Sequence, residues 1–159
     1  MIFLTVGTQL PFDRLVRLVD EWAAKNPQVD VFAQIASGNY LPKHMQYVDY
    51  LEEPFYSKIF NQASNVVAHA GMGTIINSLL ASKPVIVFPR KASLGEHRNE
   101  HQLATCHKLS VMKGCYIAYE EDDLFESLDN QNGFSGGSIA PYANDRLINT
   151  IDRFIAGPG

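Results

Sequence analysis

Basic segments, long apolar runs and closely spaced cysteines are all missing from this sequence. Its 159 residues include 13 Lys and Arg against 17 Asp and Glu, a formal net charge of −4. Because no basic run offsets that balance, nucleic acid is disfavoured as the main partner. No apolar run approaches the roughly 20 residues of a membrane-spanning helix, and residues 1–7 lack the basic start of a signal peptide. We therefore expect a cytoplasmic chain that reaches a membrane only through a partner.

The two cysteines, Cys106 and Cys115, do not have the CxxC spacing of a zinc or redox motif. We expect both to be reduced residues in or near the core. A hydrophobic content of 46% is enough to build such a core. The length suggests one domain over residues 1–159.

Strand-like apolar runs alternate with helical patterns along the chain. The expected strands are residues 2–6, 29–36, 46–51, 66–68, 85–88 and 116–119. The expected helices are one that begins near Asp13, a plausible N-cap, and others at residues 54–63, 75–82, 99–113, 122–128 and 142–155. This alternation predicts an α/β protein: a Rossmann-like open, mainly parallel sheet with helices on both faces.

The central feature is a strand, glycine turn, helix and strand between residues 65 and 102. The first strand ends at His69, the turn holds Gly71 and Gly73, and Thr74 is the expected cap of the helix. The glycines would let a ligand approach the backbone, and the helix start offers free N–H groups to an anion. A P-loop lysine and the third glycine of the dinucleotide fingerprint are missing, so NAD and FAD are disfavoured. On the turn alone, an ordinary tight βα turn is the alternative.

Two segments occur together at a characteristic spacing. Residues 1–16 read MIFLTVGTQLPFDRLV, and residues 69–89 read HAGMGTIINSLLASKPVIVFP. Together they resemble the C-terminal, nucleotide-sugar-binding half of the GT-B glycosyltransferases of family 28. The likeness is closest to the small catalytic subunits of two-component members, such as the dolichol-linked N-acetylglucosaminyltransferase and bacterial exopolysaccharide and capsule enzymes. It implies that nearly the whole chain is a single C-terminal half of a GT-B fold.

The resemblance also implies an activity. Relatives of this type are inverting, and they take a hexose from a UDP-sugar without a bound metal or other cofactor. A membrane-anchored partner subunit would supply the acceptor half, bind a lipid-linked acceptor and bring this chain to the cytoplasmic membrane. The expected setting is exopolysaccharide, capsule or glycolipid assembly.

Individual roles follow from the same resemblance. His69 would stabilise the leaving diphosphate electrostatically. Asn77 stands where relatives have Glu or Asp, whose carboxylate accepts hydrogen bonds from the ribose hydroxyls. The amide of Asn77 can still accept one such hydrogen bond, but it carries no negative charge. Asp13 is the one candidate in this chain for the general base, although a helix cap or a base on the partner explains the same facts. The implied donor-binding residues are Gly7, Thr8, Gln9, Gly71, Gly73, Thr74, Asn77, Glu96, His101 and Gln102.

Two other functions fit parts of the sequence. Residues 97–101 read H-x-x-E-H, the inverted zinc-peptidase motif, which needs both imidazoles on one helical turn and a third ligand elsewhere. A non-catalytic, regulatory nucleotide-sugar-binding module would share every binding feature of the enzyme. Metal analysis and turnover by the assembled pair distinguish these functions.

Two groups of residues have less specific interpretations. Arg90, Lys91 and Arg98 would suit an acidic sugar, but exposed loop cations are more often simply solvated. The remaining group is aromatic and is expected to be mostly core, with a docking face for the partner as the alternative: Tyr40, Tyr47, Tyr50, Phe55 and Tyr56.

Overall fold

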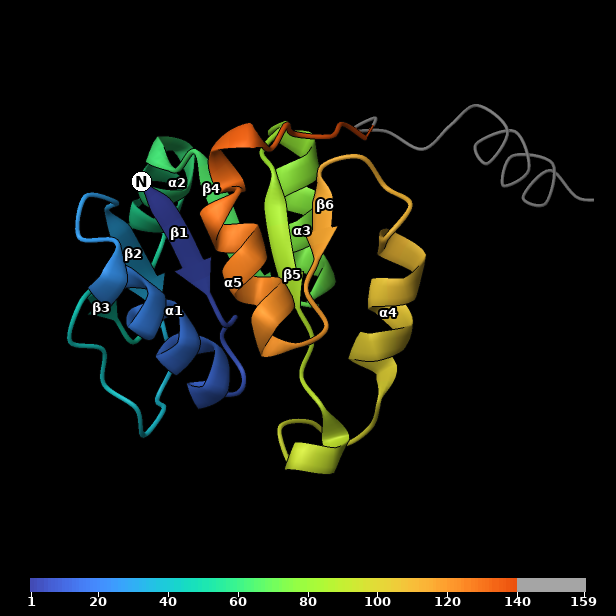
Figure 1. Cartoon of the computed structure of the whole chain (residues 1–159), viewed down its shortest axis with the longest axis horizontal. Coiled ribbons are helices and arrows are strands. Elements are labelled where there is room, and N and C mark those ends of the chain that lie inside the picture. Colours follow the sequence, from blue (N-terminus) through green and yellow to red (C-terminus); the bar gives the residue numbers. More distant parts are fainter. Residues whose placement is uncertain (140–159) are drawn as a thin grey trace, which may run out of the picture.

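A computed structural model of the chain describes residues 1–139, and Figure 1 shows a three-layer α/β domain. The six strands are β1 Ile2–Thr5, β2 Val31–Gln34, β3 Gln46–Val48, β4 Asn65–His69, β5 Val85–Phe88 and β6 Cys115–Ile117. The helices are α1 Asp13–Lys25, α2 Phe55–Gln62, α3 Met72–Leu80, α4 His101–Leu109 and α5 Glu121–Asp129, with short 3-10 turns η1 Ala92–Leu94 and η2 Gln131–Gly133. The helix predicted at residues 142–155 lies outside the described residues.

The strands form one sheet in the order β3-β2-β1-β4-β5-β6, and every ladder between them is parallel. β1 and β4 lie at the centre, with Phe3 paired to Val66 and Thr5 paired to Ala68. The chain order reverses at this pair, since later strands add to β4 on one side and to β1 on the other. Parallel sheets of this kind bind ligands beyond the carboxyl ends of the strands at such a reversal. The prediction of an open parallel sheet is confirmed.

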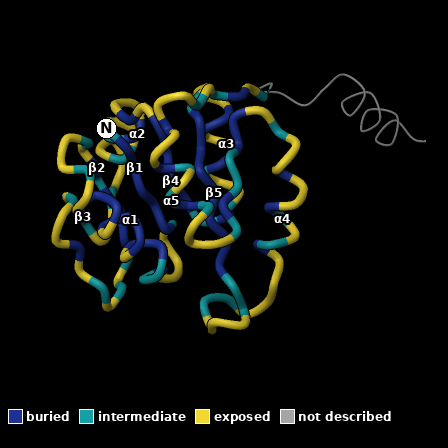
Figure 2. Tube along the Cα trace, in the orientation of Figure 1, coloured by how far each residue is buried: buried dark blue, intermediate teal, exposed yellow. Residues whose placement is uncertain are grey.

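Helices cover both faces of the sheet, as the strand periodicity requires. Ile2 and Leu4 of β1 point into one core with α1 and α5, whereas Phe3 points into a second core with α2, α3 and α4. The central strands are buried on both sides, and exposed residues lie in loops, on outer helix faces and in the edge strand β3 (Figure 2). Both cysteines lie in the second core, as expected. No described helix is long and apolar enough to cross a membrane.

Several element boundaries differ from those predicted. The helix after the glycine turn begins at Met72, so Gly71, and not Thr74, is the N-cap residue. Asp13 is likewise the first residue of α1, with Phe12 at the cap position. Its carboxylate accepts from the backbone N–H of Asn39 at 3.1 Å instead. At Asp13, a contact outside the helix takes the place of the expected capping bond.

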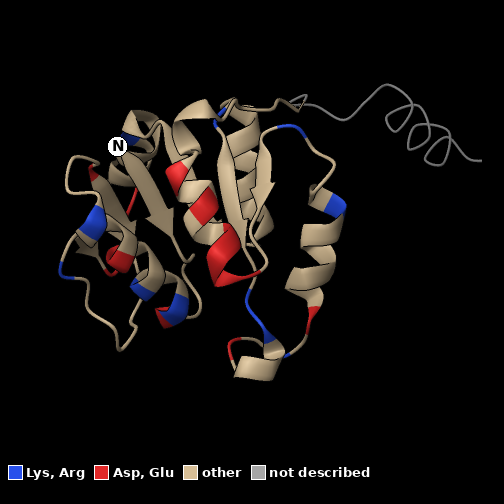
Figure 3. Ribbon diagram, in the orientation of Figure 1, with Lys and Arg blue, Asp and Glu red and all other residues tan. Residues whose placement is uncertain are grey.

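Charge is unevenly distributed over the helices (Figure 3). α5 opens with Glu121, Asp122 and Asp123 in its first turn, where carboxylates interact favourably with the helix dipole. A reciprocal capping box between Glu120 and Asp123 fixes that start. α3 contains no charged residue and has no side-chain cap. The backbone N–H groups at the amino end of α3 are therefore not capped by a side chain of residues 1–139.

Candidate functional site

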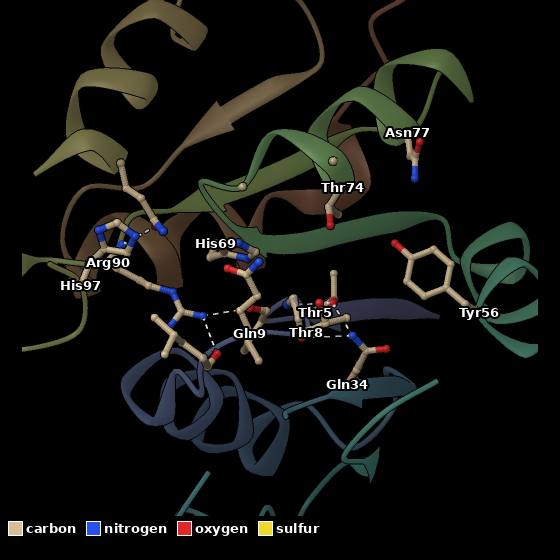
Figure 4. A pocket seen from close by; sticks show the side chains of 16 residues that line it. Thr5, Thr8, Gln9, Gln34, Tyr56, His69, Thr74, Asn77, Arg90 and His97 are labelled. Atoms are coloured by element: carbon tan, nitrogen blue, oxygen red, sulfur yellow. Dashed lines mark hydrogen bonds between the residues drawn. The ribbon is translucent and has the colours of Figure 1, made fainter. Parts of the chain in front are cut away.

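A cavity of about 500 Å³ lies at the carboxyl ends of β1 and β4. Its walls come from the loop after β1 (residues 6–11, the β1 loop), the glycine turn at the start of α3, the last residue of β2, residues that follow β5 and η1, and one residue each of α2 and α4. Figure 4 shows Arg90 and His97 at one end, Tyr56 and Asn77 at the other, and His69 between them. The cavity is therefore elongated and lies across the point where the strand order reverses.

The glycines of the two loops make room for a histidine. A Cβ on Gly71 would lie 2.2 Å from Nε2 of His69, and one on Gly7 would lie 2.7 Å from its Cε1. Gly7 also has a φ of +82°, which favours glycine. A Cβ on Gly73, by contrast, would meet nothing within 4 Å. Gly71 thus makes room for the imidazole while also lining the cavity, and Gly73 borders open space; that a ligand approaches the two glycines stays a prediction.

His69 is largely buried and is neutral at ordinary pH. Burial lowers the pKa of its imidazole to about 4, and electrostatic repulsion by Arg90 and, more weakly, by His97 acts in the same direction. The backbone of Thr5 raises this pKa, but by less than burial lowers it. No described group forms a well-directed hydrogen bond with Nδ1, which has no access to solvent. His69 can therefore donate or accept one hydrogen bond in the cavity, but it does not bring a positive charge.

Gln34 and Arg90 hold the β1 loop from opposite sides (Figure 4). Nε2 of Gln34 donates to Gly7 O at 3.2 Å and to Thr5 Oγ1 at 3.3 Å, while its Oε1 accepts from Leu51 N at 3.1 Å. Arg90 donates to backbone carbonyls of the same loop from the β5 side. Gln34 was not predicted as part of the site, and Arg90 was considered only as a cation for an acidic sugar, with a solvated loop cation as the preferred interpretation. The available signal was a polar residue at the end of an apolar strand, in β2 and just after β5.

The cavity brings together nine of the residues predicted by resemblance: Gly7, Thr8, Gln9, His69, Gly71, Gly73, Thr74, Asn77 and Gln102. Gln102 is buried, and its Oε1 accepts from the backbone N–H of Arg90 at 2.9 Å. His97, a weaker candidate, also lines the cavity. The functional roles of these residues stay predictions.

Three predicted residues do not line the cavity. Glu96 forms a paired ion bridge with Arg14, at 2.7 and 2.8 Å, and accepts from Lys91 N, so its carboxylate is already used. His101 is exposed at the first position of α4. Asp13 is engaged with the loop after β2, as described above. The structure thus does not bring Glu96 and His101, predicted to bind the donor, or Asp13, the candidate base, to the cavity, and their roles stay predictions.

The H-x-x-E-H motif does not form the geometry that zinc peptidases need. α4 begins only at His101, so His97 lies in the preceding loop, where its Nδ1 contacts Asn99 O at 3.1 Å. The two imidazoles are therefore not on one helical turn. Across residues 1–139, no three His, Cys, Asp or Glu side chains gather as metal ligands.

Comparison with known structures agrees with the fold. The glycotransferase of kitacinnamycin superposes with a TM-score of 0.59 at 20% identity, covering 81% of this chain and 34% of its own. ALG13, determined by NMR, gives 0.62 at 19% identity, covering 94% and 93%. MurG of Acinetobacter baumannii gives 0.60 at 17% identity, covering 82% and 40%. The chain thus spans about a third of the first of these enzymes and nearly all of ALG13.

Sequence comparison is more specific. No curated protein sequence matches the chain. The profile of the glycosyltransferase family 28 C-terminal domain matches residues 1–134, which is most of the chain. Together with the GT-B neighbours, this match supports a glycosyltransferase role. The chain belongs to the glycosyltransferase family 28 C-terminal domain family.

Proposed function

We propose that this chain is the donor-binding, catalytic subunit of an inverting glycosyltransferase that takes a hexose from a UDP-sugar and needs no metal. The observation that carries the proposal is the uncapped amino end of α3, which opens into the same cavity as His69 and Arg90. Free backbone N–H groups and a nearby cation are what a diphosphate requires. The other end of the cavity, with Tyr56 and Asn77, would take the nucleoside.

The proposed reaction is a single displacement at the anomeric carbon. The acceptor hydroxyl oxygen forms the new bond as the bond from that carbon to the diphosphate oxygen breaks, and UDP leaves with the electron pair. The α3 amino end and Arg90 stabilise the negative charge that develops on the leaving group, and neutral His69 adds a hydrogen bond. A general base takes the hydroxyl proton. Because Asp13 is engaged elsewhere, we place that base on the partner.

The proposed partner is a membrane-anchored protein that supplies the acceptor half and a lipid-linked acceptor, in exopolysaccharide, capsule or glycolipid assembly. Large apolar side chains are exposed in loops and helix starts that follow the carboxyl ends of strands. They are Leu10 (45%), Tyr50 (58%), Phe55 (63%), Met72 (48%) and Leu94 (58%). Exposed apolar groups around one edge favour a protein interface. Because Tyr50 and Phe55 are among them, the expectation that the tyrosine- and phenylalanine-rich segment is mostly core is corrected. We place the complex at the cytoplasmic membrane.

The test combines binding with turnover. The chain is titrated with UDP and a panel of UDP-sugars, then co-expressed with a candidate membrane-anchored α/β protein and assayed for lipid-linked product. We expect transfer from one UDP-sugar by the pair, and its loss in His69→Ala but not in His107→Ala, an exposed histidine on α4. Absence of any UDP binding would refute the proposal. Binding without turnover would leave the regulatory module as the function.

A further inference from the structure

Arg90 is a buried cation that joins two loops of the cavity. It follows Pro89 after β5, lines the cavity and is only 2% exposed. Its Nη2 donates to the carbonyl oxygens of Val6 and Leu10, both at 2.8 Å, and its Nη1 donates to that of Pro11. One guanidinium therefore holds both ends of the β1 loop, although Leu10 and Arg90 are 80 residues apart in the sequence.

Packing fixes the guanidinium in this position. Cζ of Arg90 lies 4.7 Å from the centroid of the Phe12 ring, at the start of α1. Phe12 stacks on Phe88, the last residue of β5, with ring centroids 5.9 Å apart. An arginine over an aromatic face is attracted to the ring's negative potential. The β5 end, the β1 loop and the start of α1 thus pack as one unit around Arg90.

The charge of Arg90 is not neutralised by a carboxylate. Glu96 is the nearest acidic influence on it, but both oxygens of Glu96 bind Arg14. No acidic side chain among residues 1–139 lies within salt-bridge distance of Arg90. Carbonyl dipoles solvate a buried cation without removing its net charge. The wall of the cavity therefore keeps a positive charge that an anionic ligand would balance.

We propose that Arg90 is the positioning residue of the β1 loop and the fixed positive charge that selects a phosphate or diphosphate group in this cavity. An arginine suits both tasks because its planar fork has five N–H groups. The β1 loop uses three of them, whereas a lysine ammonium has three donors in all and no fixed fork. Identifying the anion as the diphosphate of a UDP-sugar rests on the proposed function. The role of Arg90 in holding the β1 loop does not depend on the proposed function.

The first experiment measures ligand binding by titration calorimetry on the full chain. Arg90→Met removes the charge and keeps the side-chain length, Arg90→Lys keeps the charge without the fork, and Arg17→Met is a control at an exposed α1 position. The probes are inorganic pyrophosphate, UDP and uridine. We expect Arg90→Met to weaken pyrophosphate and UDP at least tenfold, about the effect of one charge-assisted bond. Uridine binding should change by less than about twofold, and Arg17→Met should bind all three like the wild type.

The second experiment needs no ligand and separates charge from packing. In Arg90→Met, NMR titration should show the pKa of His69 rising from about 4, because one of the charges that disfavour its protonation is gone. His97 and the backbone of Thr5, the other groups that act on His69, are unchanged. Arg90→Lys should restore the low pKa of His69 but not wild-type amide exchange at Val6 and Gly7, whose N–H groups donate to Gln34 O and Thr5 Oγ1. If Arg90 acted on His69 only through packing, the lysine would not restore the low pKa.

The possible outcomes test the charge of Arg90 and its hold on the β1 loop separately. A folded Arg90→Met variant that binds pyrophosphate like the wild type, or leaves the titration of His69 unchanged, overturns the inference about charge. If Arg90→Met does not fold, wild-type amide exchange in Arg90→Lys overturns the inference about the loop, and faster exchange supports it. A wild-type chain that binds pyrophosphate through Arg90 but binds no UDP-sugar refutes the proposed function and leaves the role of Arg90 standing.

Discussion

Two cavities lie at opposite edges of the sheet, and they are similar in size. The one at the carboxyl edge has a volume of about 500 Å³, and the one at the amino edge, beside β2 and β3, about 560 Å³. Their chemistry differs. The carboxyl-edge cavity has Arg90, Gln34 and Gln102 buried in its wall. The amino-edge cavity is lined mostly by exposed or half-buried residues such as Lys43, His44 and Gln46.

The comparison shows that volume alone does not identify a site. Parallel strands direct their loops and the amino ends of the following helices toward the carboxyl edge, so polar groups converge there. At the amino edge the chain arrives from helix carboxyl ends, and Val31 is the one fully buried residue among those lining that cavity. The carboxyl edge is thus where fixed, desolvated polar groups are concentrated. Substitutions at each edge of the sheet test this contrast.

The largest effect concerns His69 and pH. Because its pKa is about 4 in the folded chain and about 6.5 when unfolded, the unfolded chain takes up the proton first as the pH falls. The contribution of neutral His69 to stability is complete above pH 6.5 and is lost between pH 6.5 and 4. Denaturant unfolding at pH 7 and pH 4 should show the wild type losing about 3 kcal/mol more than His69→Asn. Equal losses in the two proteins would show that His69 is not held neutral by burial.

The next effect tests the space around that imidazole. Gly71→Ala places a methyl group 2.2 Å from Nε2 of His69, so ring or backbone must move. Overpacking of this kind costs about 2 kcal/mol, and we expect the same variant to lose most of its UDP affinity. Gly133→Ala is the matched control, since its new Cβ would meet nothing within 4 Å. Thermal unfolding and titration with UDP measure both effects. A Gly71→Ala variant as stable as Gly133→Ala would mean that the turn has free space.

The sequence predicted the fold and the location of the cavity well, for identifiable reasons. Apolar runs such as residues 85–88 read as buried strands, and the glycine turn after His69 marked a βα junction. Once strands and helices alternate, the carboxyl edge is the place for a site. The residues lining it near the two glycine loops followed from the local motif, because those loops are the ends of the two central strands.

What the sequence did not reveal depends on long-range packing. Glu96 and Arg14 are 82 residues apart, and nothing local indicates that they pair. Arg90 looked like a solvated loop cation, yet it is buried against carbonyls of a loop some 80 residues earlier. Gly71 also has a role that its spacing did not indicate, because the absence of a Cβ there makes room for the imidazole of His69. Residue type and spacing predict which groups converge but not which of them satisfy one another.

A third prediction separates the structural role of Glu96 from donor binding. Glu96→Gln breaks a two-point ion pair whose side chains are only 11% and 14% exposed, and it leaves Arg14 without its partner. We expect a loss of about 2 kcal/mol in unfolding free energy. The control is Glu21→Gln, whose pair with Arg17 is 3.7 Å long and half exposed, and which should cost less than about 0.5 kcal/mol. Similar losses in both variants would show that the ion pair of Glu96 with Arg14 does not stabilise the fold more than an exposed pair does.

The smallest expected effect bears most directly on the two cavities. Gln46→Ala and Lys43→Ala alter exposed side chains at the amino edge while leaving the backbone N–H of Lys43 free to donate to Asp20 at 3.0 Å. Because no buried polar side chain lines that cavity, affinity for UDP should change less than about twofold, against a tenfold or greater loss in Arg90→Met. Calorimetry on the same preparations measures both. If the amino-edge variants lose as much UDP affinity as Arg90→Met, the ligand binds at the wrong edge for a GT-B half. Convergence of polar groups would then no longer distinguish the two cavities.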